Sequence, residues 1–223
     1  MPKRAPNRAL PRGPHGLSRE EVERSQRERL MLAMAEVVAE KGFANVAVAD
    51  VLARAGVSRA TFYAQFKDKE DCFRATYEVA AQHIGKVMGM GIAALAATAP
   101  EQGAHLTPME KLERILTVYL DTLIGQPTFA RTFLVEVYAA GPEAVKQRLA
   151  SQELFVDIIC ETHRGESGLL GTKPEQRFAA EAIVNAVSAM MTNLIAIGDF
   201  QRIRELKEPM MNFVRELTSA SQA

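Results

Sequence analysis

Residues 45–73, NVAVADVLARAGVSRATFYAQFKDKEDCF, decide the fold. Segment 48–55 has apolar residues at helical spacing on one side and polar residues on the other, which predicts a short helix. Gly56 ends this pattern, and because glycine tolerates positive φ it can form a tight turn between two helices. Ser58 follows the turn, where its hydroxyl can cap the next helix.

Segment 59–65 predicts a second helix that is too short to bury itself as an ordinary core helix. Its exposed side carries side chains that can hydrogen-bond phosphates or base edges, namely Arg59, Thr61, Tyr63 and Gln65. A helical hairpin with a polar outer face would have the same helix–glycine–helix order. The order alone therefore favours a DNA-reading helix-turn-helix without excluding that alternative.

Residues 55–72, AGVSRATFYAQFKDKEDC, are more specific. They resemble the TetR family of transcriptional regulators, whose DNA-binding domain has the pattern AGVSxGTFYxHFxxKExL. The departures are Ala60 for glycine, Gln65 for histidine and Cys72 for leucine. The resemblance covers about residues 30–77 and implies a three-helix DNA-binding head.

The resemblance also implies roles for individual side chains. We expect Arg59, Thr61 and Gln65 to address base edges or neighbouring phosphates. Tyr63 and Lys69 would hold the phosphate backbone, and Ser58 would cap the helix and touch that backbone. Ala60 would contact a thymine methyl group.

Composition is that of a soluble globular protein, with 48% hydrophobic and 24% charged residues and a formal net charge of zero. The charge is uneven: residues 1–77 hold 14 Lys/Arg and 10 Asp/Glu, a net of +4, and residues 78–223 hold 13 and 17, a net of −4. A basic N-terminal part followed by an acidic C-terminal part favours a DNA-binding module joined to a domain that does not contact DNA.

The sequence predicts an all-α chain in three parts. Residues 1–17 carry four prolines and four basic residues after Met1 and are expected to be a disordered basic arm, either a solvated tail or a segment that lies along DNA. Residues 18–68 form the helix-turn-helix domain, and residues 69–223 a helical effector-binding and dimerisation domain. No stretch shows the period-2 alternation typical of a strand.

A long helix is expected from Lys69 to about residue 97, joining head to body. It contains Gly85, Gly89 and Gly91, each of which weakens a helix by roughly 1 kcal/mol relative to alanine. A bend, close packing or space for a ligand would each explain these glycines, and the sequence does not distinguish between the three explanations. The later helices are predicted at about 109–125, 128–138, 145–163 and 175–198, with a last helix around 210–217. Pro209 is expected either in the first turn of that last helix or at a kink.

No catalytic or cofactor-binding set emerges, because GxSxG, Walker and HExxH patterns are absent. Cys160 and His163 stand three residues apart, but two ligands on one helix do not complete a metal site. Cys72 and Cys160 form no motif, and residues 1–17 do not form a secretory signal, so a cytoplasmic location is expected. The apolar stretch 182–197 contains Asn185 and Asn193 and is interpreted as a buried or interface helix rather than a membrane span.

The resemblance implies an adaptable apolar pocket in the body that binds an effector. Its candidate residues are Met88, Met90, Met109, Phe129, Phe133 and Tyr138, although residues of this kind at helical spacing are more often plain core. The resemblance further implies a homodimer formed by the last two helices, with burial within one chain as the alternative for part of that surface. Small residues at 179, 182, 186 and 189 would let helices approach closely.

The function predicted is a ligand-responsive regulator, most simply a repressor that a small apolar effector releases from a palindromic double-stranded DNA operator. Two other classes fit less well. A helical small-molecule-binding protein or enzyme without a DNA role leaves the polar 59–65 face unexplained. A structural DNA-binding protein would need no enclosed pocket.

Overall fold

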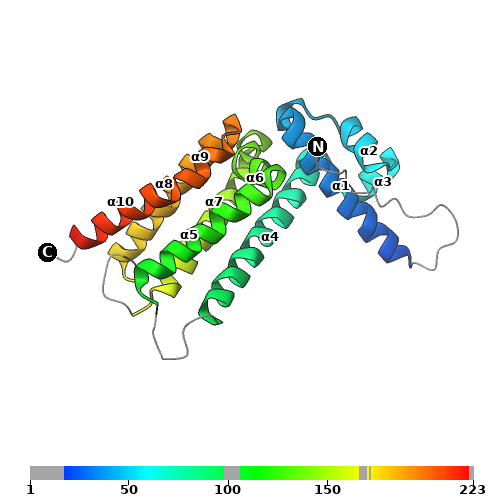
Figure 1. Ribbon diagram of the computed structural model, residues 1–223. Coiled ribbons are helices and arrows are strands. Elements are labelled where there is room, and N and C mark those ends of the chain that lie inside the picture. Colours follow the sequence, from blue (N-terminus) through cyan, green and yellow to red (C-terminus); the bar gives the residue numbers. More distant parts are fainter. Residues whose placement is uncertain (1–17, 98–105, 166–169, 171, 221–223) are drawn as a thin grey trace.

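The computed structural model describes residues 18–97, 106–165, 170 and 172–220. All of the regular elements in these ranges are helices, so the all-α prediction is confirmed. A small head, with α1, α2 and α3, and a larger body, with α5 to α10, are joined by the long helix α4 (Figure 1). The expected basic arm at 1–17 lies outside the described residues.

The head is a three-helix unit made of α1 (Arg19–Lys41), α2 (Val48–Ala55) and α3 (Arg59–Gln65), with the short 3-10 helix η1 (Phe43–Asn45) after α1. At the start of α1, Ser18 and Glu21 each accept a hydrogen bond from the backbone N–H of the other. Seven of the side chains buried in the head core are Leu30, Met34, Val38, Phe43, Val51, Phe62 and Phe66. Burial of these apolar surfaces holds the three short helices together.

The turn between α2 and α3 has the predicted geometry. Gly56 has φ +64°, a left-handed backbone conformation that is energetically unfavourable for residues with a Cβ atom. Ser58 Oγ accepts a hydrogen bond of 3.1 Å from the backbone N–H of Thr61, which caps α3. Ala47 cannot cap α2, but the Asp50 carboxylate accepts a 2.9 Å hydrogen bond from its N–H and satisfies that donor.

Helix α4 (Lys69–Ala97) packs against α1 in the head and against α5, α6 and α7 in the body. A Cβ atom built on Gly85 or Gly89 would meet no other atom within 4 Å. Close packing within the described chain is therefore not the reason for these two glycines, which leaves a bend in α4 or space for a ligand as the explanation.

In the described residues the body has seven helical segments: α5 (Pro108–Gly125), α6 (Pro127–Leu134), η2 (Glu136–Ala140), α7 (Pro142–Thr162), α8 (Pro174–Ile197), α9 (Phe200–Glu205) and α10 (Lys207–Ala220). The single helix expected at 128–138 is in fact two segments, α6 and η2, which meet at Val135. Helix α9 was not predicted. Asp199 caps it by accepting a 3.1 Å hydrogen bond from the N–H of Arg202, and Pro209 lies in the first turn of α10 as expected.

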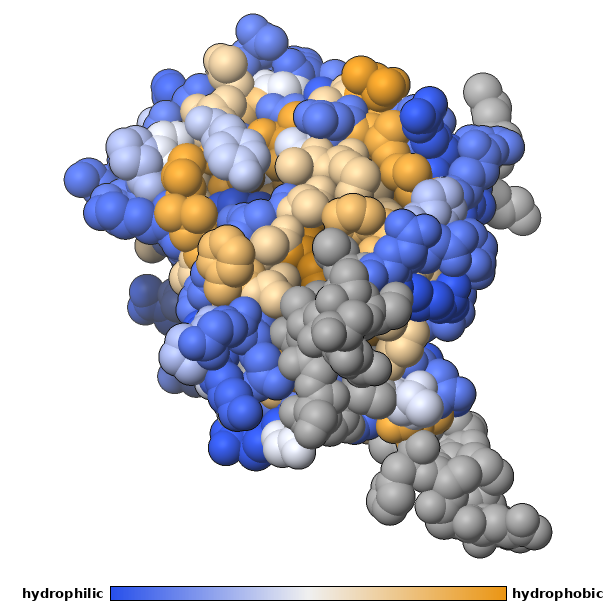
Figure 2. All heavy atoms as spheres, turned by 90° about the vertical axis from the view of Figure 1, so that its left-hand side faces the viewer, coloured by the Kyte–Doolittle hydropathy of each residue, from blue (hydrophilic) through white to orange (hydrophobic). Residues whose placement is uncertain are grey.

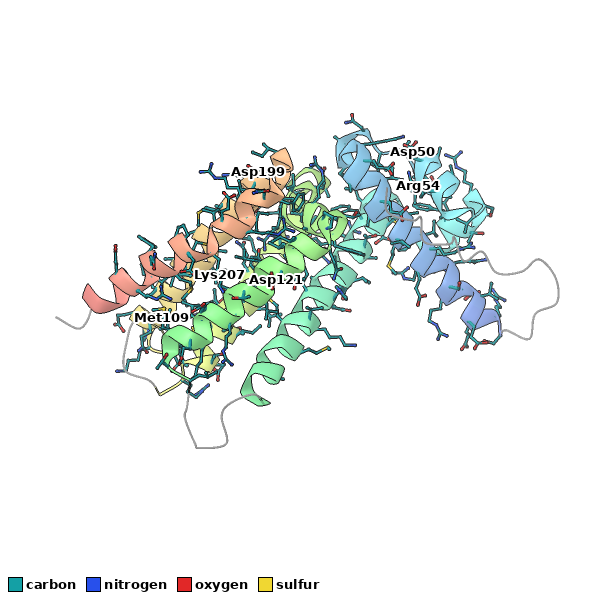
Figure 3. The ribbon with its side chains drawn as sticks, viewed as in Figure 1. Asp50, Arg54, Met109, Asp121, Asp199 and Lys207 are labelled. Carbon is teal, nitrogen blue, oxygen red and sulfur yellow. The ribbon has the colours of Figure 1, made fainter. Side chains whose placement is uncertain are left out.

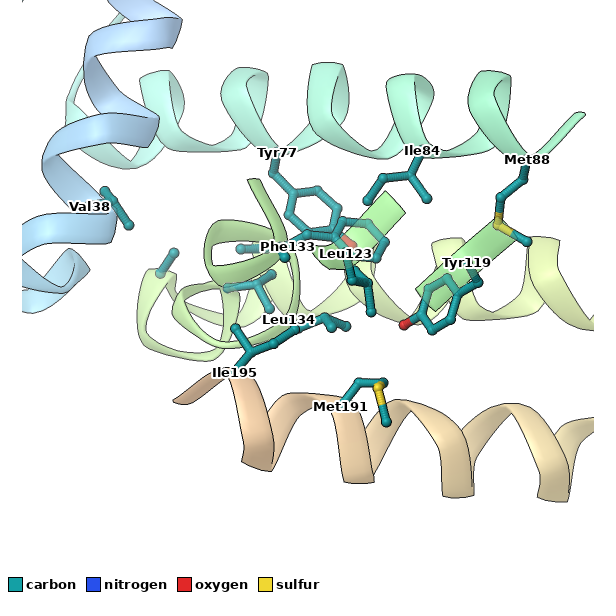
Figure 4. Close-up of a cluster of buried hydrophobic side chains, with 14 of the residues drawn as sticks. Val38, Tyr77, Ile84, Met88, Tyr119, Leu123, Phe133, Leu134, Met191 and Ile195 are labelled. Carbon is teal, nitrogen blue, oxygen red and sulfur yellow. The ribbon is translucent and has the colours of Figure 1, made fainter. Parts of the chain in front are cut away.

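The core of the body lies between α4, α6 and α8 (Figure 4). Tyr77 of α4 stacks on Phe133 of α6, with ring centroids 5.2 Å apart and planes 10° from parallel. Met191 and Ile195 close the cluster from α8. This shared core makes α4 a structural member of both the head and the body.

By length and composition alone, α8 is apolar enough to cross a membrane, but the core helix of a soluble protein passes the same test. In the structure α8 packs against α6, α7 and α9. One third of its most apolar window is buried within the chain, which leaves an apolar face uncovered.

Candidate functional site

Helix α3 presents most of the predicted DNA-contacting side chains to solvent. Ser58, Arg59, Ala60 and Tyr63 are exposed, and Thr61 is partly exposed. Phe62, on the opposite side of α3, is fully buried in the head core. One anchored apolar residue thus holds a polar surface outward, as the spacing of segment 59–65 predicts.

Arg59 carries a charge that no carboxylate neutralises in the described part of the chain. Its guanidinium lies 5.9 Å from the ring centroid of Tyr63. By contrast, Arg54 on α2, labelled in Figure 3, has two carboxylate partners. It pairs with Glu36 at 2.9 Å and with Glu40 at 2.6 Å. The charge of Arg54 serves the head's own structure, whereas Arg59 remains available to an external anion.

Gln65 is placed differently from the rest of this set. Its side-chain amide faces α1 and makes a long contact of 3.4 Å with the carbonyl of Glu23. Its backbone carbonyl accepts a 2.9 Å hydrogen bond from Arg27, whose guanidinium also covers the ring of Phe66 at 4.3 Å. The end of α3 is therefore tied to α1.

Lys69, the first residue of α4, already has partners inside the head. Its ammonium donates to the carbonyls of Val46 at 3.1 Å and Phe43 at 3.4 Å. It also lies 4.7 Å from the centroid of the Phe43 ring. This link between η1 and α4 was not predicted, because it joins residues that are more than twenty positions apart.

An apolar cavity lies in the body between α4, α5, α7 and α8. The space open to the centre of a water molecule is about 60 Å³, enough for several waters. The walls are mainly aliphatic and aromatic, with Arg148, Gln152 and Ser188 as the polar residues. The residues that line it are Met88, Leu112, Ile115, Leu116, Tyr119, Arg148, Gln152, Phe155, Ile159, Ile183, Val184, Val187 and Ser188.

Of the six predicted pocket residues, the structure places only Met88 on this wall. Met90 lies two residues further along α4, about 200° around the helix, and is 63% exposed. Tyr138 is 52% exposed, and Phe133 is buried in the neighbouring core. Phe129 lies near His83, with ring centroids 6.3 Å apart, and Met109 lies at the start of α5, outside the cavity wall (Figure 3).

The head matches a known family. Residues 30–76 match the model of the bacterial regulatory proteins of the tetR family, and they contain α2, α3 and the exposed Arg59–Tyr63 face. Residues 30–76 are therefore a DNA-binding domain of the TetR family. The protein is a DNA-binding transcriptional regulator, and regulators of this family are not enzymes.

Solved structures share the fold of this TetR-family chain over most of its length. A TetR-family regulator from Streptomyces coelicolor is 19% identical, with a TM-score of 0.66 over 92% of this chain and 98% of that chain. The fatty acid degradation regulator FadR from Bacillus halodurans is 18% identical, with a TM-score of 0.64 over 84% and 93%. FadR from Bacillus subtilis, solved with stearoyl-CoA, is 20% identical, with a TM-score of 0.64 over 83% and 95%.

No curated protein matches the TetR-family chain. At these identities the solved structures establish the fold of the body and not its ligand. The cavity residues therefore have to be interpreted from this chain's own chemistry.

Tyr119 on α5 and Arg148 on α7 both bring polar groups to the cavity lining, and the sequence analysis selected neither. Both are buried, and Arg148 has 1% exposure. Tyr119 stands within an apolar helical pattern and Arg148 on a helix rich in charged residues, so neither position stands out in the sequence. In the described ranges, no three His, Cys, Asp or Glu side chains gather as metal ligands would.

Proposed function

We propose that this TetR-family regulator is a homodimeric repressor that binds a near-palindromic operator and is released by a small apolar effector. The observation that supports this most directly is the path of α4. The same helix carries Lys69 in the head, bonded to η1, and Met88 on the wall of the cavity. A ligand that displaces Met88 would move a helix that is bonded to the DNA-binding unit.

We propose that the α3 surface reads DNA. Arg59, Ala60 and Thr61 would address base edges in the major groove or the phosphates beside them. Ser58 and Tyr63 would bind the phosphate backbone. Lys69 would add a phosphate contact through its remaining N–H donor, and Gln65 would reach DNA only after leaving its contact with α1.

The dimer is proposed to form through α8 and α10. An exposed stripe runs along α8, with Phe178 70% and Ile197 76% exposed at its ends. Between them the exposed residues are small or amide-bearing: Ala182, Asn185, Ala186, Ala189, Asn193 and Ala196. Phe213 of α10 is 59% exposed, and Figure 2 shows apolar side chains gathered across this side of the body.

Two-fold pairing of such a stripe buries the same surface on both chains. It would place the two α3 helices about 34–36 Å apart, one turn of DNA, or further apart when the heads splay. In this proposal residues 18–68 read DNA, residues 69–223 bind effector and partner, and the regulator acts in the cytoplasm.

The two rival functions explain less of the molecule. A structural DNA-binding protein has no use for an apolar cavity whose wall includes the helix leading to the head. A helical binding protein or enzyme without a DNA role has no use for the unpaired Arg59 and the exposed α3 face.

The test is a titration of the full chain with the DNA immediately upstream of its own coding region, with and without a ligand found by thermal-shift screening. We expect a sequence-specific complex of one dimer per site that the ligand weakens. Sedimentation as a monomer at micromolar concentration, or equal affinity for unrelated DNA, would count against the proposal.

A further inference from the structure

Arg148 is the largest fully buried side chain in the described part of the molecule, and it belongs to the wall of the cavity. It extends from α7, and its exposure is 1%. A guanidinium remains charged at any pH a protein experiences. The cavity therefore holds a permanent positive charge in otherwise apolar surroundings.

The charge of Arg148 is only partly satisfied. One terminal N–H group donates to Ser188 Oγ on α8, and the guanidinium lies 4.9 Å from the centroid of the Phe133 ring. Its Nε–H has no hydrogen-bond partner, and no carboxylate of the described chain pairs with it. Burying a charge without a partner raises the free energy of the folded protein, and this site lacks the counterion that would offset that cost.

Tyr119 adds a hydroxyl to the cavity lining, and Tyr77 lies in the neighbouring core. Tyr77 donates a 3.2 Å hydrogen bond to Ser151, but the hydroxyl of Tyr119 has no recorded partner in the described residues. Burial raises the pKa of Tyr119 to about 12, so this hydroxyl stays protonated and able to donate. Figure 4 shows Tyr119 beside Met88 and Met191 at one end of the cluster.

Apart from Gln152 and Ser188, the rest of the lining is apolar, and it comes from α4, α5, α7 and α8. Leu112 and Leu116 of α5, Ile159 of α7 and Val184 of α8 surround the same space. Among the described residues of the lining, Arg148 is the only charged one. A ligand that fits would combine one negative group with a compact apolar part.

We propose that the cavity binds a small amphipathic carboxylate, whose carboxylate pairs with Arg148 and whose apolar part fills the space beside Met88. A guanidinium offers parallel N–H groups that match the two oxygens of a carboxylate. A single cation favours a monoanion over a phosphate or a coenzyme A group, which carry more charge. This identification of the ligand class rests on the proposed effector role of the cavity.

The experiment measures binding to the full-length protein by calorimetry and thermal shift. The probes are octanoate, octan-1-ol, octanoyl-CoA and phenylacetate. We expect the two carboxylates to bind and raise the melting temperature, and octan-1-ol, which has the same chain and no charge, to bind at least tenfold more weakly. Tighter binding of octanoyl-CoA than of octanoate would overturn the carboxylate assignment in favour of a thioester.

The matched variants are Arg148→Met and, as a control, Arg204→Met, which removes an exposed arginine from α9. We expect Arg148→Met to fold, since an apolar side chain suits this site, and to lose roughly tenfold to a hundredfold in octanoate affinity. Its affinity for octan-1-ol should be unchanged, as should both affinities of Arg204→Met. Undiminished octanoate binding by Arg148→Met would overturn the proposal. If that variant fails to fold, the comparison of octanoate with octan-1-ol on the wild-type protein decides the proposal.

The outcomes separate this proposal from the effector role. If octanoate binds through Arg148 without changing operator affinity, the carboxylate site is confirmed and the proposed release of DNA by the effector is wrong. If only uncharged compounds release DNA, and do so equally in Arg148→Met, release by an effector is confirmed and the carboxylate site is wrong.

Discussion

The Glu136 carboxylate accepts a 2.9 Å hydrogen bond from the backbone N–H of Phe43, a residue 93 positions earlier in the chain. The same carboxylate pairs with Arg131 at 3.0 Å, and Arg131 donates to the carbonyl of Ala196 at the end of α8. A polar chain therefore runs from α8 through η2 to η1 in the head. Together with α4, it gives the body a second route to the head.

Glu136→Ala should destabilise the protein and loosen the head. The carboxylate is buried, and its removal leaves the Phe43 N–H without its acceptor and Arg131 without its ion pair, at a cost of about 1–3 kcal/mol. Operator affinity should fall less than the response to ligand. Urea denaturation and operator titrations, with and without ligand, measure the two effects.

The matched control is Glu143→Ala, which breaks an exposed pair with Lys146 on α7. Its denaturation midpoint should stay at the wild-type value. If both variants had the same midpoint, the Glu136–Phe43 link would contribute nothing to stability.

Arg59→Ala should weaken operator binding by roughly 1–3 kcal/mol and relax the preference for one base pair, if Arg59 contacts a base edge as proposed. The fold should be unaffected, because Arg59 is exposed and makes no ion pair in the described residues. Affinities for the operator and for single-base variants measure this. A uniform loss across all sequences would instead assign Arg59 to phosphate.

Lys69→Ala should weaken binding to all DNA sequences alike and reduce the salt slope by about one unit. It should also lower the stability of the head, because the ammonium donates to the carbonyls of Phe43 and Val46. Tyr63→Phe, which removes only a hydroxyl, should weaken binding without lowering stability. An unchanged salt slope for Lys69→Ala would leave Lys69 a purely structural role.

Gly85→Ala and Gly89→Ala should each stabilise α4 by up to about 1 kcal/mol, since alanine is the better helix former and the added Cβ meets no atom within 4 Å. If α4 must bend for the ligand response, the double variant should respond less while binding operator normally. Thermal denaturation and ligand titration measure the two effects. A stabilised double variant with a full ligand response would show that bending at these glycines plays no part.

Alkaline pH should destabilise the protein through Cys72. Burial raises the pKa of this thiol from 9.0 to about 12 in the folded chain. The unfolded thiol therefore loses its proton first, and the associated stability, complete below pH 9, is lost as the pH rises toward 12. Between these pH values, the free energy of unfolding should fall less steeply with pH for Cys72→Ala than for the wild type, as measured by denaturation at each pH. An identical slope would contradict the assignment to Cys72.

The sequence alone determined the head and the all-helical class of the chain. Residues 55–72 specify a capped α3, the Gly56 turn and an outward polar face through local rules of capping, backbone freedom and helical spacing. These interactions join residues within a few positions of one another. For that reason the motif could be interpreted without knowledge of any distant contact.

The tertiary structure alone decided the cavity and the links to the head. Met90 and Met88 differ by two positions, and only the docking of α4 against α5 and α7 turns Met88 inward. Arg148 resembles any helical arginine until α8 brings Ser188 to it, and Glu136 meets Phe43 only when η2 packs on η1. Burial and unpaired charge depend on segments far apart in sequence, which hydrophobic periodicity does not pair.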